Sequence, residues 1–451
     1  MNIYENEKPI GVVVQMGGQT PLNLAVPLQQ AGVPILGTSS DSIDIAEDRK
    51  RCAALLNDLG IRQPESGTAI SIDEALEVAR RIGFPVMIRP SYVLGGRAMM
   101  VAQNQDELVP FTYAAFAASP GFPVLIDRYL DRAVEVDVDV VCDATDVYIG
   151  GVQQHVEQAG VHSGDSACCT PPHSLDPKLV VEIEDACRKM ALALKVKGLM
   201  NVQLAVKDGI FYVLEINPRA SRTVPYLSKA TGVPLAKWAA RISIGQTLKQ
   251  ILAEHKPVKI TWKAVKEVVL PFNRFAGVDP ILGPEMKSTG EVMGIDSCFE
   301  LAYWKAQIAA GQNLPNSGTV FISARDADKD WIGDIAADLA KLGFKLVATE
   351  GTAKVLAAHN VTAHVVSKVC DQKGETVLDI MKVNGIQLII NTPSGPISRV
   401  DEVRIRSEAI LRSLPIITTE SGARATVACI SYMRTHDWDV KALQDYFPKL
   451  A

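Results

Sequence analysis

Two apolar runs, 199–206 and 210–216, are separated by Lys207-Asp208-Gly209, and this pattern constrains the fold more than any other in the chain. Asp-Gly between apolar runs is a strong signal for a β-hairpin, because both residues tolerate the positive φ angles of a two-residue turn. The segment is therefore predicted to form two antiparallel strands whose side chains alternate between two faces.

Polar side chains gather on one face of this hairpin. Glu215 and Asn217 are two residues apart, so both point to the same face. Counting back from the turn places Gln203 opposite Leu214, and a register shift of one residue brings Gln203 beside Glu215. Oxygen ligands of this kind hold Mg²⁺, which keeps its other sites for phosphate and water. A polar strand end facing solvent is the alternative, but three polar residues on one face of otherwise apolar strands favour a bound partner.

Three further features offer ligands for an anion. Arg219 follows Asn217 after one proline, and its guanidinium can hold a phosphate as a fork. The loop 89–97 (RPSYVLGGR) places two glycines between arginines, so its backbone N–H groups can approach a phosphate closely. It matches neither common nucleotide motif, and an ordinary Gly-Gly hairpin is an equal alternative. The segment 157–166 (EQAGVHSGDS) adds small polar residues and His162, which makes it a candidate for ligand contact.

A strand is predicted at 134–141, where charged and apolar residues alternate. Glu135, Asp137 and Asp139 share one face, and the intervening valines share the other. This alternation predicts one polar face and one buried face.

The N-terminal segment of the chain alternates strands and helices. Strands are expected at 11–15 and 33–36, with a helix from Thr20 to Gln30 between them and another near 48–59. Ser71-Ile72-Asp73-Glu74 reads as a capping box that opens a helix ending near Gly83. Because only two strands precede the helix at 48–59, the first layer is expected to be incomplete.

The C-terminal segment predicts a separate small domain after a linker at 311–317 (GQNLPNS). Strands are expected at 319–323, 345–348, 363–366, 387–391 and 415–417, with helices between them, which predicts a five-stranded parallel sheet. The turns 349–352 and 391–395 each follow a strand, so both would lie at the carboxyl edge, where α/β domains bind ligands. Lys329 and Lys368 could add positive charge. Each turn alone could be a simple helix cap, but two on one edge favour an anionic effector or substrate.

Composition excludes several classes of protein. Lys and Arg total 46 and Asp and Glu total 51, which gives a formal charge of −5, so nucleic acid is not an expected partner. No apolar run reaches the ~18 residues that a membrane helix needs, and the polar N-terminus does not resemble a signal peptide. Eight scattered cysteines form neither a disulfide scaffold nor a zinc motif, and no G-x-C-x-G or G-x-S-x-G nucleophile motif is present. A cytoplasmic α/β protein of roughly three domains is expected.

Long runs of residues resemble one known family. The runs are GGQTPLNLA, AEDR, IRPSYVLGGRAM, AVEVDVDVVCD, HVEQAGVHSGDSA, GLMNVQLAVKDG, LEINPRASRTVPYLSKATGVPLAK, KEVVLPFNRF and GPEMKSTGEVMG, within residues 10–310. Together they resemble the C-terminal half of the large subunit of carbamoyl-phosphate synthase. The final 130 residues or so resemble the methylglyoxal-synthase-like regulatory domain of that subunit.

The resemblance implies a multi-domain chain of α/β and α+β type. It implies a truncated pre-ATP-grasp α/β subdomain over 1–46, an ATP-grasp domain that phosphorylates carbamate over 47–310, and a methylglyoxal-synthase-like allosteric domain over 318–451. The implied function is ATP-dependent phosphorylation of carbamate to carbamoyl phosphate, as the C-terminal synthetic half of the glutamine-hydrolysing synthase of pyrimidine and arginine biosynthesis. The implied partners of the complete reaction are an N-terminal half of the large subunit and a glutaminase small subunit. Both are outside this sequence, so a fragment or truncated gene product is expected.

The resemblance also implies ligands, carried over position by position. The residues implied to contact ATP are Arg89, Arg128, Leu130, Glu135, Gly160, Val161, His162 and Ser163. Gln203, Glu215 and Asn217 are implied to hold Mg²⁺ or Mn²⁺, with K⁺ as an optional further ion, and Arg219 to steady the transferred phosphate or carbamate. A nucleotide effector is implied at Ser323, Lys329, Thr349, Thr352, Lys368, Asn391 and Thr392. Ornithine, the effector of some members, is implied at Glu157, Asp165, Glu267 and Thr418.

The family mechanism needs no protein nucleophile. Carbamate oxygen attacks the γ-phosphate directly, so catalysis is positioning plus charge neutralisation. Two other functions stay open. One is a different ATP-grasp ligase that joins a carboxylate and an amine through an acylphosphate, and the other is a non-catalytic effector-binding piece that acts only inside an assembly.

Overall fold

The structure is a computed structural model that describes all residues except 91–97, 276, 372–373, 393–399 and 448–451. The loop 89–97 and the turn 391–395 therefore lie mostly outside the described residues. The chain forms two compact units, the first made of 1–155, 169–261 and 441–451 and the second of 156–168 and 262–440. Within the described residues, no helix is both long enough and apolar enough to cross a bilayer.

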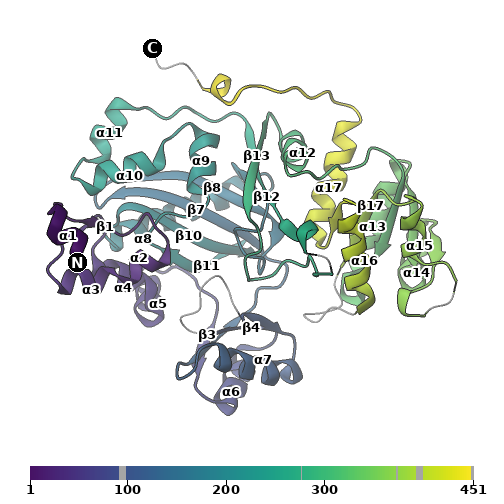
Figure 1. Cartoon of the computed structure of the whole chain (residues 1–451), viewed down its shortest axis with the longest axis horizontal. Coiled ribbons are helices and arrows are strands. Elements are labelled where there is room, and N and C mark those ends of the chain that lie inside the picture. The colour runs from purple at the N-terminus through teal and green to yellow at the C-terminus, as the bar shows by residue number, and fades with distance from the viewer. Residues whose placement is uncertain (91–97, 276, 372–373, 393–399, 448–451) are drawn as a thin grey trace. The chain divides into compact units, whose positions relative to one another are not determined.

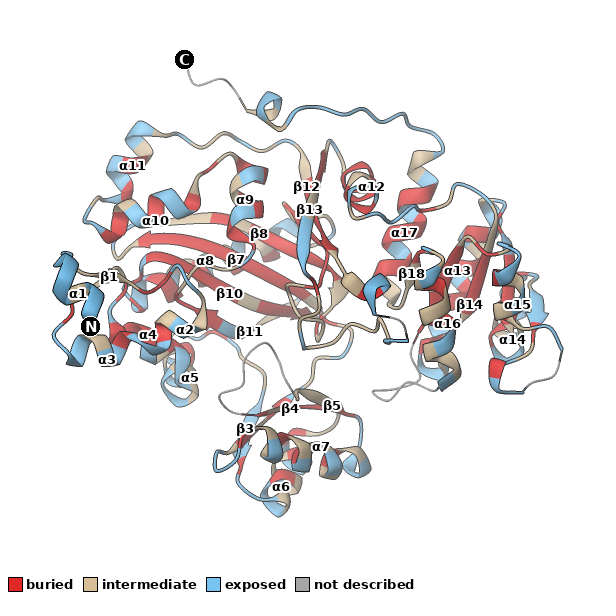
Figure 2. Cartoon of the chain, in the orientation of Figure 1, coloured by how far each residue is buried: buried red, intermediate tan, exposed pale blue. Residues whose placement is uncertain are grey.

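The main sheet of the first unit contains the predicted hairpin. The sheet includes β11 (Ile210–Asn217), β10 (Lys197–Lys207), β7 (Val134–Asp143) and β8 (Val147–Gln158), adjacent in this order, and the last three residues of β8 belong to the second unit. Val136, Val138 and Val140 are completely buried and pack with α8 (Pro177–Ala193) in one core (Figure 2). The predicted separation of charged and apolar residues along 134–141 is therefore confirmed, but the charged face is buried as well, with Glu135, Asp137 and Asp139 all inside the protein.

A second, four-stranded sheet of the first unit has the order β3-β6-β4-β5. Its strands are β3 (Ser66–Ala69), β6 (Val124–Arg128), β4 (Val86–Pro90) and β5 (Met100–Ala102), packed against α6 (Ile72–Ile82) and α7 (Gln105–Ala118) (Figure 1). The Ser71 hydroxyl caps α6 by accepting from the Glu74 N–H at 3.2 Å, as predicted. The reciprocal half of the capping box was wrong, because the Glu74 carboxylate accepts from the Ile70 N–H instead, at 2.9 Å.

The two predicted strands and the helix near 48–59 are present in the N-terminal segment, whereas the helices at 2–7 and 40–47 were not predicted and the helix at 20–30 is broken. The N-terminal elements are α1 (Asn2–Glu7), β1 (Val12–Val13), α2 (Gln19–Asn23), α3 (Ala25–Gln30), β2 (Ile35–Leu36), α4 (Ser40–Glu47) and α5 (Arg49–Asp58). The single helix predicted over 20–30 breaks at Leu24 into α2 and α3. Pro27 has no N–H for the carbonyl of Asn23, so one helical hydrogen bond is missing at the junction.

Three helices complete the first unit. They are α9 (Val224–Thr231), α10 (Leu235–Ser243) and α11 (Leu248–Glu254). Between α9 and α10, Gly232 takes a φ of 72° and Pro234 follows, so the first helix ends before the second begins. In the main sheet, α10 contacts both β10 and β7.

The second unit contains the predicted five-stranded parallel sheet, with the order β16-β15-β14-β17-β18. Its strands are β14 (Thr319–Ser323), β15 (Lys345–Thr349), β16 (His364–Val366), β17 (Leu388–Asn391) and β18 (Ile416–Ile417), and its helices are α13 (Lys329–Lys341), α14 (Glu350–Ala358), α15 (Val377–Lys382), α16 (Val400–Leu411) and α17 (Glu420–Met433). The same unit holds the antiparallel pair β12 (Lys263–Val269) and β13 (Gly290–Asp296), the turn η1 (Pro271–Arg274) and α12 (Phe299–Ala309). Strand β9 (Cys168–Thr170) lies at the boundary between the units.

Candidate active site

The hairpin register brings the predicted oxygen ligands together. The turn residues Asp208 and Gly209 have φ angles of 52° and 74°, as a type I′ turn requires. A β-bulge between Gln203 and Leu204 then shifts the register, so that Gln203 pairs with Glu215. Asn217 pairs with Asn201 on the same face, two pairs further along. The register shift of one residue that the sequence left open is therefore confirmed.

The polar face continues onto β7. Gln203 is opposite Asp137 and Asn201 is opposite Asp139, so oxygen-bearing side chains of three strands share one face. His155 Nε2 lies 3.1 Å from Asp137 Oδ2, and both side chains are almost fully buried.

This donor set fits a hard divalent cation. The other oxygen of the Asp137 carboxylate, Oδ1, is buried and has no hydrogen-bond partner among the described residues. Glu215 is exposed on the same face, where its carboxylate is accessible to a ligand. In the described portion of the chain, no three His, Cys, Asp or Glu side chains lie close enough together to hold a metal ion by themselves. A cation site here therefore depends on the amide oxygens of Gln203 and Asn217 beside the carboxylate of Glu215.

Arg219 is held in place next to this set. Its Nη2 donates to Asn217 Oδ1 at 2.9 Å and its Nη1 to the Ala220 carbonyl at 3.2 Å. Its Nε is buried and lacks a partner among the described residues. The guanidinium thus keeps a donor for an anion, as its predicted role requires.

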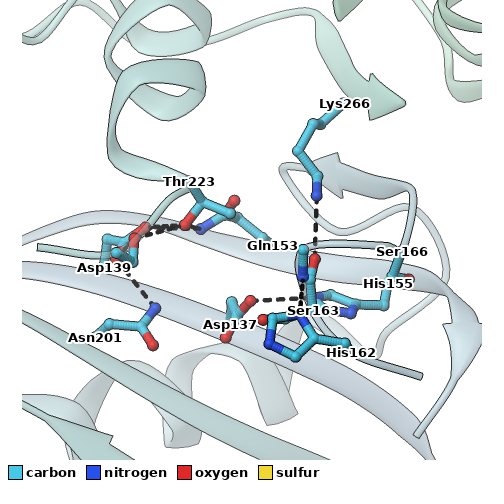
Figure 3. A network of polar contacts seen from close by, with 12 residues as sticks. Asp137, Asp139, Gln153, His155, His162, Ser163, Ser166, Asn201, Thr223 and Lys266 are labelled. Atoms are coloured by element: carbon cyan, nitrogen blue, oxygen red, sulfur yellow. Dashed lines mark hydrogen bonds and ion pairs between the residues drawn. The ribbon is translucent and has the colours of Figure 1, made fainter. Parts of the chain in front are cut away.

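Asp139 is the centre of a buried network that the sequence did not predict. Its Oδ1 accepts from Asn201 Nδ2 at 3.1 Å and from Ser221 Oγ at 2.7 Å, and its Oδ2 accepts from Gln153 Nε2 at 2.9 Å and from Thr223 Oγ1 at 2.7 Å (Figure 3). Burial raises the pKa of this carboxyl group, and the hydrogen bonds from Thr223, Ser221 and Asn201 oppose that shift. The alternation along β7 put Asp139 on the polar face, but no local pattern could reveal its partners.

Glu47, at the end of α4, is a second acidic group that the sequence did not select. Its carboxylate accepts from Gln19 Nε2 at 2.6 Å. Burial raises the pKa of Glu47, the Gln19 hydrogen bond lowers it, and the charges of Glu215 and Arg219 act on it in opposite directions. Glu47 therefore belongs to the electrostatic surroundings of the predicted site.

The predicted ATP contacts of the smaller sheet lie at strand ends. Arg89 Nη1, in β4, is 3.4 Å from Asp127 Oδ2, and Arg49 binds the same carboxylate at 2.7 and 3.1 Å. Arg128 ends β6 and donates to the Ile82 carbonyl at 3.1 Å. Arg128 and Leu130 line a cavity of about 780 Å³, together with residues around the hairpin turn.

The predicted ATP contacts of the second unit form the loop 160–163. The His162 N–H donates to the Gly283 carbonyl at 2.8 Å. The Ser163 carbonyl accepts from Lys266 Nζ at 3.1 Å (Figure 3). Lys266 is 1% exposed. A buried lysine thus fixes the backbone of this loop, which the sequence did not predict.

The four residues predicted for an amine effector also lie in the second unit. Asp165 is buried and accepts from the N–H groups of Lys287 and Ser288 at 2.7 and 2.8 Å. Glu157 accepts from Ser166 Oγ at 2.6 Å. Glu267 is buried, and burial and the charge of Glu157 raise its pKa to about 8. Thr418 directly follows β18 and is half-buried.

The seven residues predicted for a nucleotide effector follow the strands of the parallel sheet or end them. They are Ser323, Lys329, Thr349, Thr352, Lys368, Asn391 and Thr392. Thr352 Oγ1 accepts from the Ala324 N–H at 3.2 Å, and Thr392 Oγ1 accepts from the Arg325 N–H at 3.0 Å. These hydroxyls therefore shape the backbone of the edge. Lys368 is exposed, where a ligand in solution can reach it.

Comparison with known proteins decides the family. The chain matches the carbamoyl phosphate synthase preATP-grasp domain over residues 1–45, the ATP binding domain of the carbamoyl-phosphate synthase L chain over 48–251, and the MGS-like domain over 332–418. It is 48% identical over 458 residues to the C-terminal section of the carbamoyl phosphate synthase large chain of Methanocaldococcus jannaschii, covering 99% of this chain and 74% of that protein. The chain belongs to the carbamoyl phosphate synthase large chain family. The resemblance drawn from the sequence runs is therefore confirmed.

Other carbamoyl phosphate synthase relatives agree. The C-terminal section of the large chain of Aquifex aeolicus is 50% identical over 449 residues, covering 96% of this chain and 83% of that protein. The large chain of Archaeoglobus fulgidus is 53% identical over 447 residues, covering 99% of this chain and 41% of that protein. The chain thus spans about two-fifths of that undivided large chain.

Solved structures confirm the ATP-grasp fold. The biotin carboxylase domain of 2-oxoglutarate carboxylase from Hydrogenobacter thermophilus, solved with ADP, magnesium and bicarbonate, has a TM-score of 0.55 and 17% identity, covering 67% of this chain and 73% of that chain. Biotin carboxylase from Campylobacter jejuni has a TM-score of 0.55 and 14% identity, and the match covers 67% of this chain and 76% of that chain. At these identities the likeness concerns the fold alone.

Proposed function

We propose that this chain phosphorylates carbamate with ATP to give carbamoyl phosphate, as the C-terminal synthetic half of a glutamine-hydrolysing carbamoyl phosphate synthase. One observation carries the proposal: the bulge, which leaves Leu214 of β11 as the extra residue, pairs Gln203 with Glu215, beside Asn217 and the arginine that follows it. Oxygen ligands next to a guanidinium suit the transfer of a phosphoryl group between two anions.

In this proposal, one group of side chains binds the cation and Arg219 orients the reacting groups. Gln203, Glu215 and Asn217 would hold Mg²⁺ or Mn²⁺, which when bound neutralises charge on the β- and γ-phosphates. Arg219 would orient the γ-phosphate or carbamate through its unpaired Nε. The carbamate oxygen then attacks the γ-phosphorus, the bond to the bridging oxygen breaks, and ADP leaves with the electron pair. No protein group is alkylated, acylated or phosphorylated, so the rate depends on alignment.

The remaining ATP ligands belong to the same proposal. They are Arg89, Arg128, Leu130, Glu135, Gly160, Val161, His162 and Ser163, with K⁺ as an optional further ion. The proposal includes an N-terminal half of the large subunit and a glutaminase subunit as partners in the complete reaction, and a cytoplasmic location. Its three regions are the pre-ATP-grasp subdomain at 1–46, the ATP-grasp domain at 47–310 and the regulatory domain at 318–451.

The regulatory domain and the loop before it are proposed to bind effectors at two places. The edge formed by the ends of β14, β15 and β17 offers hydroxyls and backbone N–H groups to a nucleotide phosphate. The acids Glu157, Asp165 and Glu267 suit a diamine such as ornithine, and Thr418 would add a hydroxyl.

Run in reverse, the reaction gives a direct test. The purified full chain should form ATP from ADP and carbamoyl phosphate in the presence of Mg²⁺. Glu215→Gln removes the only carboxylate of the proposed cation set and should lower kcat by about 100-fold or more. A coupled assay that consumes ATP measures both rates.

Glu291→Gln, on the exposed start of β13, is the matched control and should keep the parent rate. A folded chain that binds ATP without forming it from carbamoyl phosphate would contradict the proposal. Phosphate release with another carboxylate and amine pair would then favour a different ligase, and tight nucleotide binding without any turnover would favour a purely regulatory piece.

A further inference from the structure

Gln15 is a buried amide that touches both sides of Arg219. Its Nε2 donates to the Pro218 carbonyl at 2.7 Å. Its own backbone carbonyl accepts from the Ala220 N–H at 2.9 Å. One residue from the N-terminal segment of the first unit therefore fixes the peptide groups before and after the arginine, although Gln15 and Pro218 are 203 positions apart in the chain.

The amide of Gln15 is itself held in one orientation. Nε2 also donates to Thr38 Oγ1 at 2.8 Å, and Oε1 accepts from the Thr38 N–H at 3.2 Å. A Cβ at Gly37 would lie 2.5 Å from Oε1, and a Cβ at Gly198 would lie 3.1 Å from it. The surroundings thus fit a long side chain that donates from one terminal atom and accepts at the other, as the glutamine amide does.

The segment after Arg219 is held separately by Asp139. Residues 218–223 form neither helix nor strand, so hydrogen bonds from outside the segment must define their path. Ser221 and Thr223 both donate to the Asp139 carboxylate at 2.7 Å. Gln15 therefore holds the backbone on both sides of Arg219, whereas Asp139 holds the side chains of Ser221 and Thr223, two and four residues further along.

We propose that Gln15 is a positioning residue for phosphoryl transfer, acting through Arg219. This rests on the proposed function, because it assigns Gln15 to the arginine that would orient the transferred group. An apolar side chain of the same length would fill the space but would leave the Pro218 carbonyl without its donor. The arginine would then lose its fixed backbone while the ADP site stayed intact.

Gln15→Met tests this in the full chain, because methionine keeps the length and removes the amide. We expect kcat for ATP formation from ADP and carbamoyl phosphate to fall about 10- to 100-fold, since misplacement of a catalytic group by about 1 Å has this effect. The KM for ADP should stay within about twofold of the parent value. The control is Gln154→Met: Gln154, in β8, is also buried, and its amide bonds to Ser174 Oγ at 2.6 Å and to the N–H groups of His173 and Ser174 at 3.1 and 3.0 Å, away from the backbone around Arg219.

A double mutant separates positioning from general destabilisation. If Gln15 acts through Arg219, adding Gln15→Met to Arg219→Ala should lower kcat by less than about twofold more. A kcat in the double variant that is reduced by the product of the two single reductions would overturn the proposal. An unchanged kcat in Gln15→Met would also overturn it.

Amide hydrogen exchange tests whether Gln15 orders the segment 219–223, and it does not depend on an activity assay. Exchange across 219–223 should become faster in Gln15→Met and stay unchanged in Gln154→Met. If the parent chain forms no ATP, the proposed function is wrong, but faster exchange in Gln15→Met would still show that Gln15 orders the segment 219–223. Unchanged exchange in Gln15→Met would overturn the positioning role of Gln15.

Discussion

Single ionisable residues of this chain have environments that predict pH dependence. Glu267 is buried in the second unit near Glu157, and its pKa is raised from 4.5 to about 8. The folded chain therefore keeps a proton that the unfolded chain releases. The contribution of Glu267 to the free energy of unfolding is complete below pH 4.5 and is lost as the pH rises toward 8.

Thermal unfolding between pH 5 and pH 8 should show this loss. In the parent chain, Glu267 should lower the free energy of unfolding by at most about 1.4 kcal/mol per pH unit as the pH rises. Glu267→Gln keeps the shape and an acceptor for Gln307 Nε2 and should flatten the dependence. Parallel profiles for both proteins would show that Glu267 is ionised throughout.

The same residue predicts how a diamine would bind. A cation is attracted to the ionised form of Glu267, so its binding must release the proton that burial retains. Ornithine affinity, measured by calorimetry, should therefore rise between pH 6 and pH 8 in the parent chain. An affinity independent of pH would place the amine elsewhere.

At the scale of elements, the hairpin turn is the simplest feature to test. Gly209 has a φ of 74° and an added Cβ would meet no atom within 4 Å, so only backbone strain opposes a larger residue. Gly209→Ala should lower the free energy of unfolding by about 1–2 kcal/mol. Gly209→Asn should cost less, because asparagine tolerates this conformation. Urea unfolding that gave equal losses would contradict the account of the turn.

Local sequence patterns predicted most of the helices and strands, but they predicted only part of the candidate active site. The five strands of the parallel sheet were predicted within a few residues, because alternating apolar runs and turns mark them. The break at Leu24 could have been read from Pro27, which cannot donate to the residue four positions before it. The bulge at Leu214 has no local signature, so the count from the turn left the register of Gln203 open. The contact of Gln15 with Pro218 spans 203 residues, and no local pattern encodes it.

At the scale of the whole molecule, one buried ion pair joins distant segments of the second unit. Arg406, in α16, is fully buried and donates to Asp279 Oδ1 and Oδ2 at 2.7 and 2.8 Å. It also donates to Asn391 Oδ1 at 2.7 Å, at the end of β17. The segment that follows η1 also supplies the Gly283 carbonyl to His162. Hydrogen bonds from Arg406 to Asn391 and to Asp279 thus link the end of β17, part of the proposed effector site, to the segment 279–283. The carbonyl of Gly283 in that segment binds the loop 160–163, which is proposed to contact ATP.

Removing one partner of this pair should destabilise the second unit. Asp279→Leu leaves the guanidinium of Arg406 buried without its main counter-ion, which costs about 3–5 kcal/mol. The double variant Asp279→Leu with Arg406→Met should recover most of this loss, because no unpaired charge is then buried. Urea unfolding measures all three proteins. A double variant as unstable as the single one would contradict the role of the ion pair.

The central claim is that Gln203, Glu215 and Asn217 hold a divalent cation against the phosphates of ATP, and Mn²⁺ binding followed by electron paramagnetic resonance tests it most directly. With a non-hydrolysable ATP analogue present, the parent chain should bind Mn²⁺, and Glu215→Gln and Asn217→Ala should each weaken binding about 10-fold or more, while Glu291→Gln should not. Equal Mn²⁺ affinity in the parent chain and both site variants would contradict the claim.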